Sequence, residues 1–345
     1  MSAPLKPILK NGRFYNTEQD KPASLLFDTI PSFFHSLFVR KNSIPKNQQQ
    51  WISYDQVVPS SEIPTITWIG HATFLIQIQG INILTDPILG GASFLYPRRL
   101  PPGISLDKLP PIDLVLISHN HHDHMHGDTL IQLKNRFERM QVYVPRGDRP
   151  WFDQRGFAQT KEFMWEESTY IINRNTQKIV CTFVPAYHWS QRGFFDKNKS
   201  LWGGWMIQTD HMCIYFAGDS AYSRPFFNYI GKLFPYIDVA LLPIAHITPR
   251  DWMKHTHVEA HEEGQAFLDI GAHHFIPMHW GTFGFGNDHF EVPIDAVQEW
   301  WLRNDDTLTQ KNLHILKVGQ RFIVPSRPIQ TDISTVQPAI LQKQV

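Results

Sequence analysis

Short apolar runs interrupted by Gly, Pro, Asp and Asn fill the first half of the central sequence and indicate successive β-strands. Further along, segments with apolar residues three or four positions apart alternate with such runs, which indicates helices between strands. The predicted strands are 65–69, 73–79, 82–86, 113–118, 141–144, 178–184, 204–209, 212–217, 238–243, 274–278 and 320–324, and the predicted helices are 128–139, 224–234, 258–270 and 293–303. This order suits an α+β fold in which two packed sheets are flanked by helices.

The same pattern divides the chain into three parts. Residues 1–62, rich in Pro, Asn, Gln and Ser, form an N-terminal extension, residues 63–325 form one domain, and residues 326–345 form a C-terminal tail. An apolar island at 25–40 predicts a short amphipathic helix within the extension. Its Phe-rich face fits either a lipid headgroup layer or a docking surface on the domain or on a second subunit.

A cluster of potential metal ligands follows the predicted strand 113–118. The run is Ser118-His119-Asn120-His121-His122-Asp123-His124, in which the spaced candidates are His119, His121, Asp123 and His124. Imidazole and carboxylate ligands suit Zn²⁺ best, although Fe, Mn or Co would accept them. Four candidates are too many for one catalytic zinc, which takes three protein ligands and keeps one position open. The motif therefore predicts two metal ions.

The remaining ligands are expected where later strands end. A lone His or Asp follows an apolar run and precedes turn-forming residues at His188, Asp219 and His279. The first metal is assigned to three histidines: His119, His121 and His188. The second metal is assigned to three other residues: Asp123, His124 and His279. We assign Asp219 to both ions as a bridge.

Two further polar residues lie in predicted turns near these ligands. Asp86 ends the strand 82–86 and is expected to orient a ligand histidine, although an Asp-Pro turn would show the same pattern. His71 lies in a Gly-His-Ala-Thr turn, where we expect a structural hydrogen bond rather than metal binding.

Several longer segments resemble the N-acylphosphatidylethanolamine-hydrolysing phospholipases D, a family with the metallo-β-lactamase αββα fold. The resemblance runs from about residue 11 to about residue 323 with the order of motifs kept. The histidine motif alone indicates only the superfamily. Two segments are more specific: Asp196-Lys197-Asn198-Lys199-Ser200-Leu201-Trp202-Gly203 and His279-Trp280-Gly281-Thr282-Phe283.

This resemblance implies a reaction and its residues. Two zinc ions would share a hydroxide that attacks phosphorus, releasing N-acylethanolamine and phosphatidic acid, with Asp123 and Asp219 as the catalytic carboxylates. His122 and His257 match positions that contact substrate in the family, although His122 stands where the family tends to carry Tyr. The resemblance further implies a phospholipid substrate and peripheral contact with a membrane surface, and it suggests a homodimer.

Composition narrows these expectations. Lys and Arg together number 32, as do Asp and Glu, so no basic excess points to nucleic acid. No stretch of 18 apolar residues occurs, and the two cysteines, Cys181 and Cys213, lie in apolar runs typical of buried free thiols. We expect a cytoplasmic protein that associates peripherally with membranes.

Three other functions are consistent with parts of the sequence. A hydrolase of a small phosphodiester or a sugar-phosphate lactone would use the same metal motif, but it would not need the apolar helix at 25–40. A redox di-iron protein normally has Glu where His121 stands. A lipid-binding module without metal would not need the intact ligand set.

Overall fold

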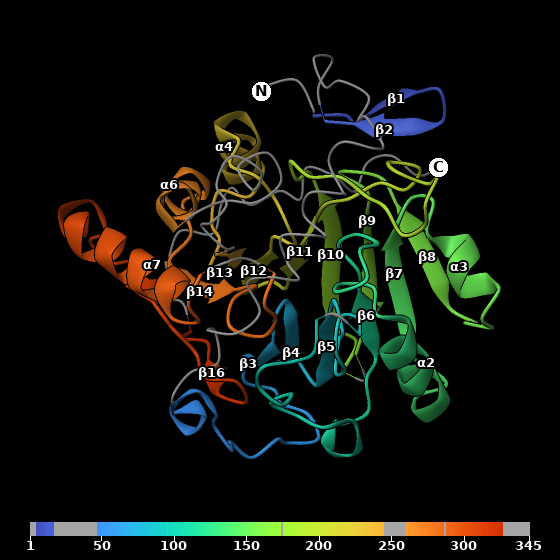
Figure 1. Cartoon of the computed structure of the whole chain (residues 1–345), viewed down its shortest axis with the longest axis horizontal. Helices are drawn as coiled ribbons and strands as arrows, with labels where there is room; N and C mark the ends of the chain where they lie inside the picture. The colour runs from blue at the N-terminus through green and yellow to red at the C-terminus, as the bar shows by residue number, and fades with distance from the viewer. Residues whose placement is uncertain are drawn as a thin grey trace.

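The computed structural model describes residues 5–16, 47–94, 96–173, 175–244, 260–285 and 288–326. Within these residues two seven-stranded sheets pack face to face, and helices lie on both outer sides (Figure 1). This four-layer arrangement confirms the predicted α+β class.

The first sheet has the order β16-β3-β4-β5-β6-β7-β8. Its strands are β3 (Thr65–Gly70), β4 (Thr73–Ile78), β5 (Ile81–Thr85), β6 (Leu114–Leu116), β7 (Gln141–Pro145), β8 (Thr160–Phe163) and β16 (Arg321–Ile323). Pairing is antiparallel from β16 to β5 and parallel from β5 to β8. The carboxyl ends of β5 and β6 therefore meet at the same edge.

The second sheet has the order β15-β14-β13-β12-β11-β10-β9. Its strands are β9 (Ser168–Ile172), β10 (Lys178–Val184), β11 (Gly204–Gln208), β12 (Cys213–Phe216), β13 (Val239–Pro243), β14 (His274–Met278) and β15 (Asn312–Leu313). Strands β12 to β15 are parallel, so β12 and β14 also end at a common edge.

Alternating side chains explain why the sheets stack. On β4, Phe74 and Ile76 face the core between the sheets, whereas Leu75 faces the outer side. Rings of the first sheet reach the second: Phe163 lies 5.1 Å from Trp205, centroid to centroid. Strands buried on both faces in this way read as nearly continuous apolar runs, which is why they were predictable.

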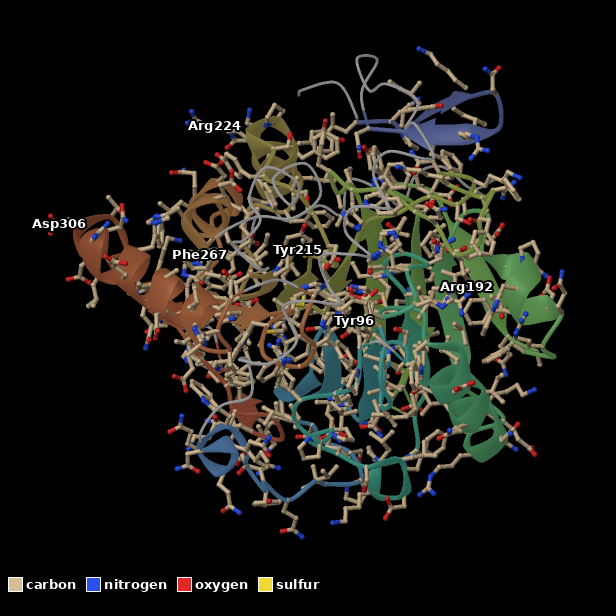
Figure 2. All side chains as sticks on the ribbon, viewed as in Figure 1. Tyr96, Arg192, Tyr215, Arg224, Phe267 and Asp306 are labelled. Atoms are coloured by element: carbon tan, nitrogen blue, oxygen red, sulfur yellow. The ribbon has the colours of Figure 1, made fainter. Side chains whose placement is uncertain are left out.

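The helices form two outer layers. They are α2 (Gly127–Arg136), α3 (Arg149–Asp153), α4 (Arg224–Leu233), α6 (Ala260–Ile270) and α7 (Val292–Arg303). The first two cover the outer face of the first sheet through Leu130 and Phe152. The other three cover the second sheet, where Phe267 stacks on Phe275 with centroids 5.3 Å apart. Figure 2 shows Phe267 within this helical layer and the exposed Asp306 at its outer end.

Some elements were not predicted. Three 3₁₀ turns, the short helix α3 and strands β8, β9 and β15 carry little apolar periodicity, and most β9 side chains are partly or fully exposed. The N-terminal extension contains a hairpin of β1 (Ile8–Lys10) and β2 (Arg13–Tyr15). The 3₁₀ turns are η1 (Gln48–Trp51), η2 (Leu106–Lys108) and η3 (Asp305–Thr307).

Several predictions fall on residues that the structure does not describe. The predicted helix at 25–40, His257 and nearly all of the tail 326–345 lie outside the described ranges. Both cysteines lie within them and are buried free thiols, as expected. Among the described residues, no helix has the length and apolar content that crossing a membrane requires.

Candidate metal centre

The seven predicted ligands converge at the edge where both sheets present strand ends. The histidine motif follows β6 of the first sheet, while His188, Asp219 and His279 follow β10, β12 and β14 of the second. Ligand atoms of the first predicted group all lie within 4.8 Å of one another: His119, His121 and His188. The second group meets the same limit and includes one additional residue: His71, Asp123, His124 and His279.

Asp219 lies between the two groups. Its Oδ2 is 3.2 Å from Nε2 of both His124 and His279. The same oxygen is 4.0 Å from His119 Nε2 and 3.8 Å from His188 Nε2. A single carboxylate that faces both sets of imidazoles has the arrangement of a bridging ligand, so the residues present fit two cations.

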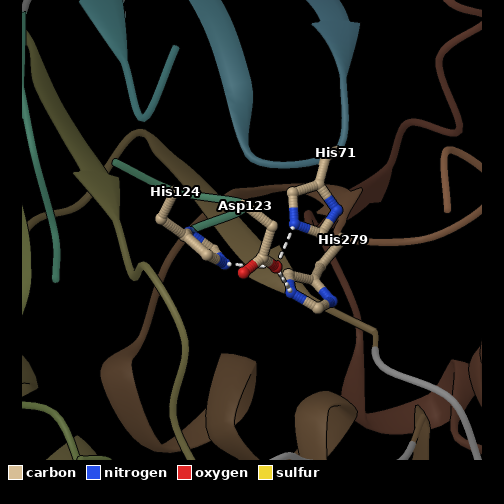
Figure 3. Close-up of side chains that lie close together, drawn as sticks. All are labelled: His71, Asp123, His124 and His279. Atoms are coloured by element: carbon tan, nitrogen blue, oxygen red, sulfur yellow. Dashed lines mark hydrogen bonds and ion pairs between the residues drawn. The ribbon is translucent and has the colours of Figure 1, made fainter. Parts of the chain in front are cut away.

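Figure 3 shows Asp123 among the rings of His71, His124 and His279. Asp123 is the most exposed residue of this second group. Its Oδ2 lies 2.8 Å from His71 Nε2, 3.3 Å from His124 Nε2 and 3.7 Å from His279 Nε2. Its side chain is 18% exposed, against 2% or less for His124 and His279. Within the second group, solvent therefore reaches Asp123 rather than the histidines.

Gly218 allows the two sheets to meet closely at the centre. A Cβ at this position would lie 2.5 Å from Ser118 Cβ, next to the first ligand histidine, and 2.9 Å from the Gly203 carbonyl oxygen. Its φ of +64° also lies in the left-handed region that favours glycine. A side chain here would push Asp219 away from the histidine motif.

Behind the ligands, Asp86 anchors the motif. Its Oδ1 accepts a hydrogen bond from the Ser118 backbone N–H at 2.7 Å, and its Oδ2 lies 2.7 Å from His124 Nδ1. The Ser118 hydroxyl lies between Asp86 Oδ2 at 2.5 Å and His119 Nδ1 at 2.9 Å. These contacts reach a histidine in each predicted metal position, His124 directly and His119 through Ser118.

A model of the β-lactamase superfamily domain matches residues 81–280 of this chain. The chain is 32% identical to N-acyl-phosphatidylethanolamine-hydrolyzing phospholipase D 1 of Caenorhabditis elegans over 244 residues, which is 68% of each chain. It is 29% identical to the mitochondrial enzyme of the same name from Saccharomyces cerevisiae over 246 residues, 68% of this chain and 52% of the yeast protein.

The chain belongs to the metallo-β-lactamase superfamily. Within it, the relatives just described identify the branch of the N-acylphosphatidylethanolamine-hydrolysing phospholipases D. The fold agrees with that of a solved protein: Igni18, a metallo hydrolase from the archaeon Ignicoccus hospitalis, superposes with a TM-score of 0.56 at 22% identity, covering 75% of this chain and 97% of Igni18. The family match and the relatives, rather than the Igni18 structure, make the protein a metal-dependent hydrolase.

The electrostatics of this metallo-β-lactamase centre favour anionic carboxylates. Burial alone would raise the pKa values of Asp123 and Asp219, but neighbouring imidazoles outweigh burial and hold both well below the usual range. Burial and the adjacent imidazoles lower the pKa of His119 well below its usual value. Deprotonated carboxylates and neutral imidazoles are the forms that bind metals.

The imidazole of His279 behaves differently. Burial lowers its pKa, but the Asp219 and Asp123 carboxylates outweigh burial and raise it to about 9. The same two carboxylates raise the pKa of His124 well above its usual value. Each of these rings therefore holds a proton that a cation would displace.

The predicted substrate contact His122 lies at the exposed side of the motif. Its Nε2 is 3.0 Å from the Arg192 carbonyl oxygen, in the loop that follows His188. The Arg192 guanidinium donates in turn to the Met125 carbonyl at 2.7 Å. These two hydrogen bonds hold the loop against the histidine motif. His122 lies on the solvent-exposed side of this contact.

The loop after His188 explains one of the specific sequence motifs. Ser190 closes it by accepting from the Asn198 backbone N–H at 2.7 Å and by donating its hydroxyl to the Ser200 carbonyl at 2.5 Å. The closed loop holds Trp189 edge-on to His121, with centroids 4.3 Å apart. The Asp-x-Asn-Lys-x-Leu-Trp-Gly segment thus supports a predicted ligand.

His71 is the functional candidate that the sequence placed outside the metal centre. The expected hydrogen bond exists, but its partner is Asp123, a predicted ligand, and the ring lies among the second group. Burial and the nearby His279 lower the pKa of His71 to about 3, so the ring is neutral. Only the turn itself was visible in the sequence, and no local pattern indicates what the turn packs against.

Proposed function

We propose that this hydrolase is a dinuclear zinc phosphodiesterase that cleaves N-acylphosphatidylethanolamine into N-acylethanolamine and phosphatidic acid. The observation that carries the proposal is the convergence of the seven predicted ligands, Asp219 and two groups of three beside it, in a relative of enzymes named for this reaction. Iron or manganese would accept the same donors, so the metal content of the purified protein tests the choice of zinc.

The predicted ligands would divide between two ions. The first ion would be held by His119, His121 and His188. The second would be held by Asp123, His124 and His279. Asp219 would bind both, and Asp86 would hold His124 in orientation. Bound zinc would supply Lewis-acid chemistry, lowering the pKa of water and neutralising charge on phosphate oxygens.

The protein's own residues would balance the charge of the cations and contact the phosphate of the substrate. The low pKa values of Asp123 and Asp219 supply two negative charges that balance the cations. Asp123 also lines the exposed side, where a phosphate would enter. We assign His122, exposed beside Arg192, to a hydrogen bond with a phosphate oxygen, and we retain His257 as a second phosphate contact.

The test is turnover of detergent-dispersed N-acylphosphatidylethanolamine by purified protein, following release of both products. We expect Asp219→Asn to reduce turnover at least about 100-fold, because one neutral amide cannot hold two cations as a carboxylate does. Asp210→Asn, a change at an exposed acid, is the matched control and should leave turnover unchanged. Two bound metals without product release would reject the lipid and direct attention to small phosphodiesters and sugar-phosphate lactones.

We also propose that the enzyme acts at a membrane surface. The loop beside His122 carries two adjacent phenylalanines, Phe194 and Phe195, that are 86% and 78% exposed. The Asp196 carboxylate accepts the Gly193 backbone N–H at 2.8 Å, so the turn that presents both rings is held by its own hydrogen bonds. Paired exposed aromatic rings beside a centre for lipid phosphate suit insertion among headgroups.

Replacing both rings by serine (Phe194→Ser with Phe195→Ser) should weaken sedimentation with phosphatidylethanolamine-containing vesicles by about 10-fold or more, because each buried ring contributes about 1.5–3 kcal/mol. Tyr54→Ser, at a residue that is 87% exposed elsewhere, is the control. Unchanged sedimentation of the double variant would reject this surface. We also propose the homodimer that the family resemblance suggests, and light scattering of the protein without vesicles tests it.

A further inference from the structure

We propose that His71 is a positioning residue for the second metal ion, donating its Nε2–H to the Asp123 carboxylate and so fixing that ligand. The inference rests on the metal assignment made above and adds a residue to it. It separates His71, which acts through Asp123, from the residues that bind the ion themselves.

Distances in the second group distinguish two kinds of contact. Ligands of one tetrahedral zinc lie about 3.3–3.6 Å apart, given metal–ligand distances of about 2.0–2.2 Å. His124 Nε2 lies 3.3 Å from Asp123 Oδ2 and 3.2 Å from Asp219 Oδ2, close to that spacing. His71 Nε2 lies 2.8 Å from Asp123 Oδ2, which is the length of a hydrogen bond.

Coordination number also separates the ligands of the second ion from His71, which only hydrogen-bonds to one of them. Asp123, His124, His279 and the bridging Asp219 already offer four protein ligands to the second ion. A fifth from His71 would fill the position that substrate or water needs, because catalytic zinc keeps one position open and expands only to five. The distance criterion alone is insufficient, since His119 Nε2 and His121 Nδ1 also lie only 2.7 Å apart. The ligand count decides.

The backbone of His71 holds the ring in place. The residue lies in the β3–β4 turn with φ of +56°, a conformation that few side chains adopt. Its N–H donates to Thr282 Oγ1 at 2.6 Å, and its carbonyl accepts from Trp68 Nε1 at 2.9 Å and from the His279 N–H at 3.1 Å. The turn is therefore bonded directly to a predicted ligand of the second ion.

Contacts with neighbouring aromatic rings also hold the His71 ring in place. The His71 ring lies 4.1 Å from the His279 ring and 5.0 Å from the Phe283 ring, centroid to centroid. Asp123, by contrast, comes from the bend of the motif and is partly exposed. A fixed donor against a more accessible carboxylate is the arrangement expected of a group that orients a ligand.

The test compares two substitutions of similar shape. His71→Gln keeps an N–H donor near the position of Nε2, whereas His71→Met removes it. Zinc binding is measured by calorimetric titration of metal-free protein and by metal content after dialysis. We expect His71→Met to weaken the second zinc about 10–100-fold and to leave the first unchanged. His71→Gln should retain both, as should the control His211→Leu at an exposed histidine.

Other outcomes overturn the inference. Two zinc ions bound with unchanged affinity in His71→Met would mean that the ring has only a structural role. Loss of the second zinc in both variants would mean that His71 is itself a ligand. If His71→Met does not fold, His71→Gln alone decides, because it must retain both ions. Normal metal binding without lipid turnover would reject the proposed reaction and leave this role of His71 intact.

Discussion

Hydrogen bonds behind the candidate ligands determine how well each residue of the centre is oriented. Asp86 is fully buried and contacts both the Ser118 backbone and the His124 ring. Ser118 continues the chain of contacts to His119. Loss of one charge at Asp86 therefore affects both predicted metal positions, although Asp86 belongs to neither ligand set.

Replacing Asp86 by asparagine should lower zinc affinity about 10–100-fold, because an amide cannot accept from Ser118 and His124 together as a carboxylate does. Zinc titration of the metal-free protein measures the change. Asp128→Asn, at an exposed acid in the first turn of α2, should behave as the unchanged protein. Wild-type affinity in Asp86→Asn would show that the ligands are oriented without this contact.

A single residue, Asp148, should make the free energy of unfolding depend on pH. Burial raises its pKa to about 7, despite hydrogen bonds that include one from Asn120 Nδ2 at 2.9 Å. The pKa of an unfolded Asp is about 4, so between about pH 4 and 7 the folded state holds a proton that the unfolded state has lost. The free energy of unfolding should therefore fall as pH rises through this window.

The change Asp148→Asn should remove that slope and increase stability at pH 8 by about 1–3 kcal/mol, since a neutral side chain has no charge to bury. Urea unfolding at pH 4.5, 6 and 8 measures it, with Asp153→Asn, at the exposed end of α3, as control. Equal slopes in both variants would contradict the raised pKa.

Among the elements, the helices of the second sheet's outer layer pack through a glycine. A Cβ at Gly264 of α6 would lie 2.4 Å from the indole ring of Trp300 on α7. This close approach sets the distance between the two helices. Helix propensity therefore favours alanine at this position, whereas packing against Trp300 favours glycine.

Propensity alone predicts that Gly264→Ala stabilises the protein by about 1 kcal/mol. We expect destabilisation by about 1–3 kcal/mol instead, because Trp300 must move out of a packed layer. Thermal or urea unfolding distinguishes the two signs. Gln265→Ala, on the exposed face of the same helix, should change stability little. A more stable Gly264→Ala would mean that α7 adjusts freely.

Element-scale structure was predictable where burial produces a clear pattern. The buried strands β4, β5, β10 and β12 have apolar runs, and the predicted ligands lie in the segments that follow β6, β10, β12 and β14. The edge strands β8 and β9 mix polar and apolar residues, so their burial pattern gave no signal. The role of His71 depends on where the β3–β4 turn meets the end of β14, a contact between distant segments that local periodicity does not encode.

At the scale of the whole molecule, the candidate metal centre lies where the two sheets meet. The histidine motif comes from the first sheet, and His188, Asp219 and His279 come from the second. Ions held by both sets act as cross-links that the unfolded chain cannot reproduce, because the ligands are then far apart. Metal binding should therefore contribute directly to the stability of the sandwich.

Removing metal with a chelator should lower the midpoint of thermal unfolding by several degrees, and added zinc should restore it. A ligand at 100 times its Kd stabilises a protein by about 2.7 kcal/mol. Scanning calorimetry with and without zinc measures the shift, and Asp219→Asn should show a smaller one. An identical midpoint with and without metal would show that the sheets need no cross-link.

The exposure of Asp123 has a consequence for inhibitor design. The side chains of His119, His124, His188, His279 and Asp219 are all 2% exposed or less, whereas Asp123 is 18% exposed and His121 is also partly exposed. A small molecule would therefore meet Asp123 and His121 first, the two residues that flank the exposed His122 in the chain. Compact metal-binding groups suit a centre whose ligands are mostly buried, whereas bulky chelators that need to surround an ion do not. Selectivity between related enzymes would depend on the residues that an attached linker contacts outside the metal centre.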